Sequence, residues 1–298
     1  MFMATLLTDP ARPVLDRMTV ESLRNAWGGG DAVWLDPAVA AEFALQAMPA
    51  NRWEVWQGLQ HLGIDLVVQP ACGRRKRLLL ADMDSTMIRQ ECIDELADEA
   101  GVGAQVAAIT ARAMNGEIAF EDALRDRVAL LAGLPEAVIG AVIRDRITMM
   151  PGGAVLVATM RARGGHAALV SGGFTAFTGP VAVRLGFDEH RANVLRVQDG
   201  VLTGRVAEPI LGRAAKVDAL HQIAGRLGLT AADVLAVGDG ANDLGMLGIA
   251  GAGVALHAKP VVAAACDIRI NHGDLTALLY LQGYAREEFC DRTEGIRE

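Results

Sequence analysis

From Leu78 onward, short apolar runs alternate with helical patterns, and this alternation constrains the fold more than any other feature of the sequence. The apolar runs are predicted strands at 78–84, 166–171, 234–238, 252–256 and 268–271. Helical patterns occupy 154–163, 214–227 and 275–282. Uniformly apolar runs are typical of strands buried on both faces, and their alternation with helices favours a parallel sheet. We therefore predict an α/β fold with a Rossmann-like parallel sheet wrapped by helices.

The first of these strands ends in Asp82-Met83-Asp84-Ser85-Thr86. Residues two apart in a strand point to the same face, so Asp82 and Asp84 would present two carboxylates at the carboxyl end, where ligands bind in open α/β sheets. Adjacent like charges are unfavourable unless a cation such as Mg²⁺ offsets them through oxygen ligands. A solvated acidic turn would have the same local sequence. Ser85 and Thr86 are expected to support the loop and have no catalytic role.

Two later strands also end in polar, glycine-containing segments. Ser171-Gly172-Gly173 follows one apolar run, and Gly238-Asp239-Gly240-Ala241-Asn242-Asp243 follows another. Glycine allows a backbone to approach a phosphate closely, and N–H groups at the start of a helix can bind it. A plain strand-to-helix turn would look the same. Lys216 lies near the start of the helical pattern 214–227 and, taken alone, is indistinguishable from a surface lysine.

Residues 85–170 are far more than one crossover between parallel strands needs. Helical patterns fill this segment at 92–99, 105–114, 120–131 and 136–145. We predict an inserted helical cap at about 88–150 over the carboxyl end of the sheet, where it would exclude water from a reactive intermediate. A second excursion, 195–206, has Asp199-Gly200 at its centre and is predicted to be a β-hairpin.

Four elements, in this order, resemble the signature motifs of haloacid dehalogenase (HAD) superfamily phosphatases. They are Asp82–Thr86, Ser171–Gly173, Lys216 and Gly238–Asp243. Glu91 and the segment Phe120–Arg127 narrow the resemblance to phosphoserine phosphatases, and the match covers about residues 75–290. The resemblance implies a HAD-like core with a helical cap. It also implies a phosphoric monoester hydrolase that converts O-phospho-L-serine to L-serine and phosphate, the last step of serine biosynthesis.

The same resemblance implies three catalytic residues. Asp82 would be the nucleophile and would form an aspartyl-phosphate intermediate, which splits one difficult step into two. Asp84 would be the general acid and base. Lys216 would pair with Asp82 and with the oxygens of the phosphoryl group.

The cofactor implied by the resemblance is Mg²⁺. Its ligands would be Asp82, Asp239 and a backbone carbonyl from Asp84, while Asp243 would orient the metal shell or Lys216. In the substrate site, Glu91 would bind the ammonium of phosphoserine, Arg127 its carboxylate, and Phe120 would line the pocket. The predicted phosphate-binding residues are Ser171, Gly172, Gly173, Lys216 and Asn242.

Three other functions fit parts of the sequence. Gly238-Asp239-Gly240 after a strand hints at a dinucleotide-binding oxidoreductase, but Asp239 and Asp243 would repel a pyrophosphate. A phospho-receiver domain also uses clustered aspartates, a lysine and Mg²⁺, but it needs no helical insertion. Within the phosphatases, the alternative is a HAD phosphatase or phosphotransferase that acts on another small phosphomonoester.

Residues 1–72 are predicted to form a separate small α/β domain. Strands are expected at 4–8, 32–35 and 64–69, with a helix at 53–62. In related phosphatases such an extension resembles an ACT-like, amino-acid-binding regulatory domain. The boundary is placed after Pro70, with the basic quartet Arg74–Arg77 as a solvated linker into the 73–298 phosphatase domain. Because every predicted site residue lies beyond it, we expect the phosphatase domain to fold and act without residues 1–72.

Composition excludes several kinds of partner. The net charge of −8 and pI of about 5.3 argue against binding to nucleic acids or anionic membranes. None of the four cysteines are in C-x-x-C spacing, and no basic and apolar leader opens the sequence. We expect a cytoplasmic protein with a small-molecule substrate, phosphoserine; a homodimer is left open.

Overall fold

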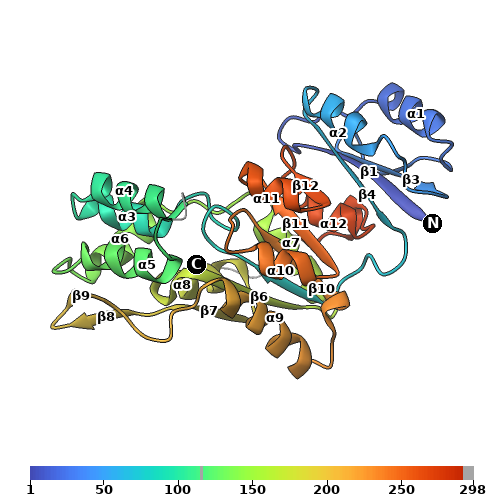
Figure 1. Ribbon diagram of the computed structural model, residues 1–298. Helices are drawn as coiled ribbons and strands as arrows, with labels where there is room; N and C mark the ends of the chain where they lie inside the picture. Colours follow the sequence, from blue (N-terminus) through green and yellow to red (C-terminus); the bar gives the residue numbers. More distant parts are fainter. Residues whose placement is uncertain (115–116, 291–298) are drawn as a thin grey trace.

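The computed structural model describes residues 1–114 and 117–290, and Figure 1 shows two α/β units and a group of helices beyond them. The larger unit is built on a six-stranded parallel sheet in the order β12-β11-β10-β5-β6-β7. Its strands are β5 Leu78–Ala81, β6 His166–Phe174, β7 Glu189–Asn193, β10 Val234–Gly238, β11 Ala252–Leu256 and β12 Ile268–Ile270. The predicted α/β parallel sheet is therefore confirmed.

Alternation along the strands sends successive apolar side chains to opposite faces of this sheet. Leu79 and Val237 belong to the hydrophobic cluster on one face, while Leu78 and Ala236 belong to the cluster on the other. The first face packs on α7 Gly153–Ala162, α8 Thr175–Leu185 and α12 Ala277–Leu281. The second face packs on α9 Arg213–Arg226, α10 Leu244–Ile249 and α11 Pro260–Ala265. Burial on both faces explains the uniformly apolar strands.

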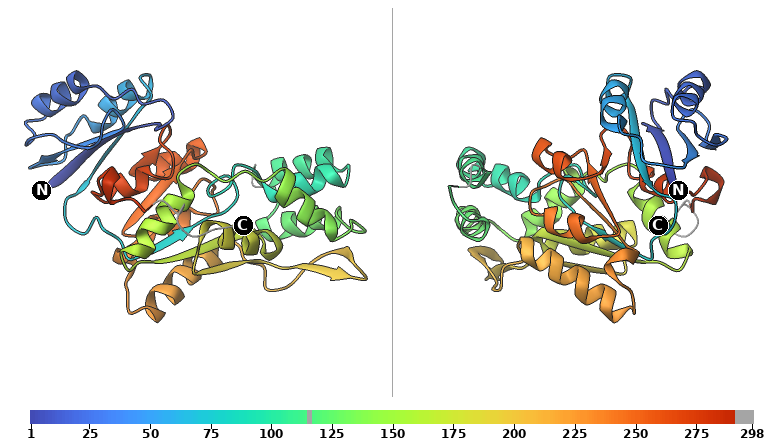
Figure 2. Two further views of the ribbon diagram at one scale, coloured as in Figure 1. Left: turned by 180° about the vertical axis from the view of Figure 1, so that it is seen from behind. Right: turned by 45° about the vertical axis from the view of Figure 1, so that its right-hand side comes forward.

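The insertion between β5 and β6 forms the predicted helical cap. It contains α3 Cys92–Glu99, α4 Gly103–Met114, α5 Phe120–Ala129 and α6 Ala137–Asp145. The two segments that connect it to the core run side by side, because Arg89 N donates to Thr148 O and Met150 N to Met87 O. Both views in Figure 2 show the cap at one end of the molecule.

The predicted hairpin is also present, as β8 Leu195–Gln198 paired antiparallel with β9 Val201–Val206. It does not stand alone beside the sheet but lies along the cap. Gly133 N of the cap donates to Leu202 O, and Glu136 N donates to Gly200 O. The cap is therefore attached to the core domain by this hairpin as well as by its two connecting segments.

The N-terminal unit is a four-stranded antiparallel sheet in the order β2-β3-β1-β4 with two helices. Its elements are β1 Phe2–Thr8, α1 Arg17–Ala26, β2 Val33–Asp36, β3 Ala40–Leu45, α2 Arg52–Gln60 and β4 Ile64–Pro70. The helices and the inner sheet face share one hydrophobic cluster, which includes Leu6, Val20 and Leu66. The β-α-β-β-α-β order is ferredoxin-like.

The other face of this small sheet packs against the larger domain. Leu7 and Val67 are fully buried in the same hydrophobic cluster as Leu278 of α12. Gln69 donates its amide to Leu281 O, and Tyr280 donates its hydroxyl to Asp36. The two domains therefore share a continuous apolar interface.

Several sequence-based expectations are corrected. β5 ends at Ala81, so Asp82 and Asp84 lie in the loop after the strand, and strand alternation is not what brings their side chains to one site. No ranges were predicted for helices α1, α8, α10 and α11 or for strands β3 and β7. The basic quartet is not a uniformly solvated linker, because Arg74 forms a largely buried ion pair at 2.6 Å with Glu42 of the N-terminal domain.

No helix in the described part of the chain is long and apolar enough to cross a membrane.

Candidate active site

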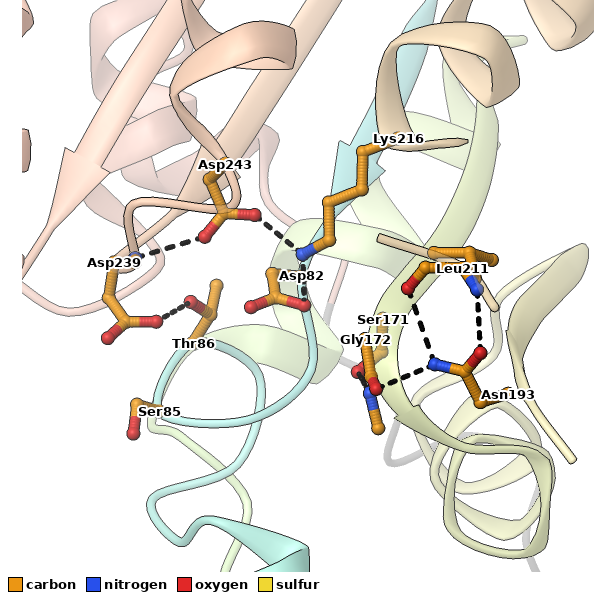
Figure 3. Close-up of polar contacts among 12 residues, drawn as sticks. Asp82, Ser85, Thr86, Ser171, Gly172, Asn193, Leu211, Lys216, Asp239 and Asp243 are labelled. Atoms are coloured by element: carbon orange, nitrogen blue, oxygen red, sulfur yellow. Dashed lines mark hydrogen bonds and ion pairs between the residues drawn. The ribbon is translucent and has the colours of Figure 1, made fainter. Parts of the chain in front are cut away.

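Asp82, Lys216 and Asp243 form a buried charged group at the carboxyl end of the parallel sheet (Figure 3). The Lys216 ammonium lies 2.6 Å from Asp82 Oδ1 and 2.6 Å from Asp243 Oδ1, and none of its side chain is exposed. Burial alone would lower the pKa of Lys216, but Asp243 and Asp82 raise it above its ordinary value. Lys216 therefore keeps its charge inside the protein and points it at Asp82.

Three carboxylates meet beside this lysine. Oxygens of Asp82, Asp239 and Asp243 lie within 4.8 Å of one another, and all three residues are buried. Burial, with repulsion from Asp243, raises the pKa of Asp82 well above its usual range and that of Asp239 to about 6. One lysine cannot balance three ionised carboxylates, so full ionisation of this site needs a further positive charge. Buried carboxylate oxygens of this kind are the donors that a hard divalent cation prefers.

The loop after β10 is shaped around the Asp243 carboxylate. Asp243 Oδ2 accepts a hydrogen bond from Gly240 N at 3.0 Å. A Cβ atom at position 238 would lie 2.4 Å from the Asp243 carboxyl carbon, so only glycine fits there. The glycines of this loop therefore accommodate an internal carboxylate, which already accepts a backbone N–H of the loop.

Asp84 has a different environment from Asp82. Its Oδ1 accepts a hydrogen bond from Cys92 N at the start of α3, and burial, with repulsion from Glu91, raises its pKa to about 7. A Cβ atom at position 173 would lie 2.7 Å from Asp84 Oδ2, so Gly173 allows the serine loop to approach this carboxyl group. Near neutral pH, Asp84 can therefore both give and take a proton.

The sequence placed Ser171, Gly172 and Gly173 in a turn after the strand. In the structure they are instead among the last residues of β6, directly before α8. The pairing of β6 with β7 is irregular between Val170 and Phe174, so the backbone leaves regular strand geometry here. Ser171 Oγ accepts from Gly173 N at 2.9 Å, which leaves the hydroxyl proton free to donate.

One cleft joins these groups to the cap. It has a volume of about 600 Å³ including its open side. Its lining residues are Asp82, Asp84, Glu91, Ile93, Phe120, Leu124, Arg127, Ser171, Gly172, Gly173, Phe174, Asp239, Gly240, Asn242 and Lys259. All predicted site residues line it except Lys216 and Asp243, which lie behind Asp82. One cleft thus brings together residues that lie more than 100 positions apart in the sequence.

The cap places one anion and one cation on the cleft wall. Glu91 lies at the N-terminus of α3 and accepts a hydrogen bond from Ser85 Oγ at 2.8 Å. Arg127 of α5 donates to Ala123 O at 3.1 Å and to Thr110 Oγ1 at 3.4 Å. Burial lowers the pKa of Arg127, while Asp94 and Glu91 counteract that effect. Opposite charges held on one wall suit a zwitterionic group.

Asn193 is a supporting residue that the sequence did not reveal. Its amide nitrogen donates to Gly172 O at 2.8 Å and its Oδ1 accepts from Leu211 N at 2.6 Å (Figure 3). It therefore ties the serine loop to the segment that leads into α9 and Lys216. No local pattern marks an asparagine at the end of a polar edge strand as part of a site. Lys259 was also missed, although it follows a predicted strand at the ligand-binding edge.

Comparison with known proteins finds the same family that the sequence motifs resemble. The model of the haloacid dehalogenase-like hydrolase family matches residues 79–248. A solved structure described as a phospho-aspartyl intermediate analogue of phosphoserine phosphatase shares 42% identity, covers 69% of this chain and 98% of its own, and superposes with a TM-score of 0.65.

The chain belongs to the phosphoserine phosphatase family of HAD-like hydrolases.

Other family members resemble the chain over more of its length. The Streptomyces coelicolor phosphoserine phosphatase is 42% identical over 256 residues, which is 85% of this chain and 62% of that protein. A HAD family hydrolase from Salmonella enterica serovar Typhi covers 94% of this chain and 97% of its own, with 31% identity and a TM-score of 0.84. The chain spans 62%, 56% and 64% of the lengths of three curated family members.

Proposed function

We propose that this chain is a Mg²⁺-dependent phosphoserine phosphatase that acts through an aspartyl-phosphate intermediate. The observation that carries the proposal is the composition of one cleft. The sheet supplies a buried carboxylate paired with a buried lysine, and the cap supplies Glu91 and Arg127. The first pair suits phosphoryl transfer, and the second suits the ammonium and carboxylate of an amino acid.

In this proposal Asp82 attacks phosphorus, and the bond from phosphorus to the serine oxygen breaks. Asp84 donates its proton to that oxygen, for which a pKa of about 7 is well suited. Asp84 then takes a proton from the water that hydrolyses the aspartyl phosphate, which restores both carboxyl groups. Lys216, Ser171 and Asn242 stabilise the phosphoryl oxygens through charge and hydrogen bonds.

The proposed cofactor site consists of Asp82, Asp239 and the backbone carbonyl of Asp84, with Asp243 holding Lys216. The three clustered carboxylates, when ionised, carry more negative charge than Lys216 neutralises, which is the condition a divalent cation would relieve. Magnesium would supply charge neutralisation for the transferring phosphoryl group.

Substitution of Asp239 tests the metal assignment. Asp239→Asn keeps the side-chain shape but removes one charge, so we expect weaker Mg²⁺ binding and activity that partly returns at high Mg²⁺. The measurement is phosphate release against Mg²⁺ concentration, alongside calorimetric titration of the protein with Mg²⁺. If neither the half-saturation point nor the calorimetric affinity changes, Asp239 is not a ligand.

Substitution of Arg127 tests the substrate assignment. Arg127→Ala removes a charge-assisted hydrogen bond, which is worth about 1.5–3 kcal/mol, or about 10–150-fold in kcat/KM for phosphoserine. The kcat/KM for an aryl phosphate, which lacks the carboxylate, should fall much less. Glu91→Gln should lower kcat/KM for phosphoserine in the same selective way, because it weakens binding of the ammonium.

Arg125→Ala is the matched control for this experiment, because Arg125 lies on the same helix but is exposed and paired with Asp122 and Glu208. It should leave both substrates unchanged. If Arg127→Ala lowers kcat/KM equally for phosphoserine and for the aryl phosphate, Arg127 serves cap closure. A HAD phosphatase for another small phosphomonoester then becomes the better assignment.

The other functions considered fit the site less well. The Asp243 carboxylate occupies the glycine loop after β10, which disfavours dinucleotide binding. The helical cap has no use in a phospho-receiver domain. All four cysteines are free, which supports a reducing compartment such as the cytoplasm. We also propose residues 1–72 and 73–298 as the two domains of the chain.

A further inference from the structure

Asp65 of β4 is a carboxylate of the N-terminal domain that is fully buried against the larger domain. Its Oδ1 accepts a hydrogen bond from Asn271 N, and its Oδ2 accepts from His272 N and Gly273 N, each at 2.9 Å. A buried carboxylate is costly unless such donors compensate it. Asp65 therefore fixes the loop that follows β12, at the same sheet edge as the candidate active site.

The next contact lies inside the larger domain. Gly273 O accepts a hydrogen bond from His257 Nε2 at 2.8 Å, and His257 N donates to Ile270 O at 2.7 Å. The backbone of His257 has a φ of 45°, in the left-handed region that costs energy for a residue other than glycine. These two hydrogen bonds hold His257, the first residue of the loop after β11, in that conformation.

The loop of residues 257–259 ends in the active site. Lys259 N donates to the backbone carbonyl of Asp239 at 3.2 Å, and the Lys259 side chain lines the cleft. The positive charge of Lys259 also favours the ionised form of Asp239. Hydrogen bonds linked through the backbone of residues 257–259 therefore connect Asp65 of one domain to the backbone of Asp239, the proposed metal ligand of the other.

We propose that Asp65 is a positioning residue for the phosphatase site, through which the N-terminal domain fixes Lys259 and Asp239. The inference rests on the proposed function, because it assigns Asp239 to the metal site. Gln60 of the same domain also accepts a hydrogen bond from the Asn271 side chain at 2.7 Å, but only Asp65 binds the backbone N–H of Gly273, whose carbonyl continues the series. Two further contacts lead to α12 instead: Gln69 binds Leu281 O, and Asp36 binds Tyr280. These contacts stabilise docking, whereas Asp65 also sets the geometry of the site.

The test compares three variants of the full chain. Asp65→Asn is isosteric, but its amide can accept at one oxygen only and turns an NH₂ group toward a backbone donor. His257→Asn shortens the side chain, tolerates positive φ and breaks the series inside the larger domain without touching the interface. Tyr280→Phe is the control, because it removes an interdomain hydrogen bond that does not lead to the site.

Two readouts are used. The first is hydrogen exchange of peptides covering residues 257–262 in protein without metal, which needs no activity. The second is phosphoserine hydrolysis against Mg²⁺ concentration. Asp65→Asn and His257→Asn should each speed local exchange and raise the Mg²⁺ half-saturation about 3–10-fold, the effect of one or two hydrogen bonds, with kcat at saturation nearly unchanged. The double variant should be no worse than the stronger single variant, because both break one series.

Tyr280→Phe should lower the melting temperature and change neither readout. The inference is overturned if Asp65→Asn behaves like Tyr280→Phe. It is also overturned if the effects of Asp65→Asn and His257→Asn on the Mg²⁺ half-saturation add in the double variant. Because His257→Asn leaves the interface intact, it tests the series even where Asp65→Asn does not fold. If the parent protein releases no phosphate from phosphoserine, the proposed function fails, while the exchange measurement still decides the positioning role of Asp65.

Discussion

Asp82→Asn is expected to abolish turnover, with a loss of about 10⁴-fold or more in kcat, as found when a covalent nucleophile is removed. The substitution keeps the size of the side chain and removes only the attacking charge. Phosphate release from phosphoserine measures the loss. A phosphate mimic such as BeF₃⁻ should bind the parent covalently and fail to do so in the variant.

The folded state should tolerate this change. Because burial raises the pKa of Asp82 in the folded protein, its ionised form opposes folding near neutral pH, and this penalty disappears in the asparagine variant. Lys216 keeps Asp243 as its partner at 2.6 Å. We therefore expect a melting temperature without metal that is equal to or above that of the parent. Near-normal turnover in a folded variant would refute the nucleophile assignment.

Deletion of residues 1–72 is expected to destabilise the remaining chain severely. The deletion would expose the side chains on α12 that now pack against Leu7 and Val67, and each apolar side chain returned to water costs about 1.5–3 kcal/mol. A folded domain has only about 5–15 kcal/mol of stability in total, so a few such losses are sufficient to unfold it. This expectation replaces the one drawn from the sequence, in which the larger domain worked alone.

The measurement is the solubility and melting temperature of a chain that begins at Gly73, next to the parent. Phosphatases that lack this domain exist, since one solved member matches only 69% of this chain over 98% of its own length. A second deletion variant therefore carries polar substitutions at Leu278 and Leu281, which make the face exposed by the deletion less apolar. Recovery of solubility in that variant would identify the exposed apolar face as the cause, whereas a stable unsubstituted deletion would contradict the prediction.

The parallel sheet and the cap helices were predictable because both are strongly patterned. Buried strands such as Leu78–Ala81 and Val234–Gly238 are apolar throughout, and each ends in a polar motif at the ligand-binding edge. The cap helices were predicted to within a few residues of their observed ends. Edge strand β7, Glu189–Asn193, was missed because its side chains are mostly polar and only half-buried.

The missed parts depend on contacts between distant segments. Asp65 lies in a strand whose alternate residues, Ile64, Leu66 and Val68, face its own domain. The Asp65 side chain points to the opposite face of the sheet, toward the larger domain, and a local sequence pattern does not reveal this contact. The same is true of Asn193, whose partners are Gly172 and Leu211. The closeness of Asp82 and Asp84 was foreseen for the wrong reason, since the loop after β5 rather than strand alternation places them.

The hairpin β8–β9 has a mechanical consequence for access to the cleft. A cap joined to a core only by two adjacent connecting segments can rotate about those segments. Here Gly133 and Glu136 of the cap are also hydrogen-bonded to the hairpin, which continues directly from edge strand β7. Any movement of the cap must bend or carry this third attachment. A movement of the cap would therefore carry the hairpin with it and would bend the chain where the hairpin leaves β7.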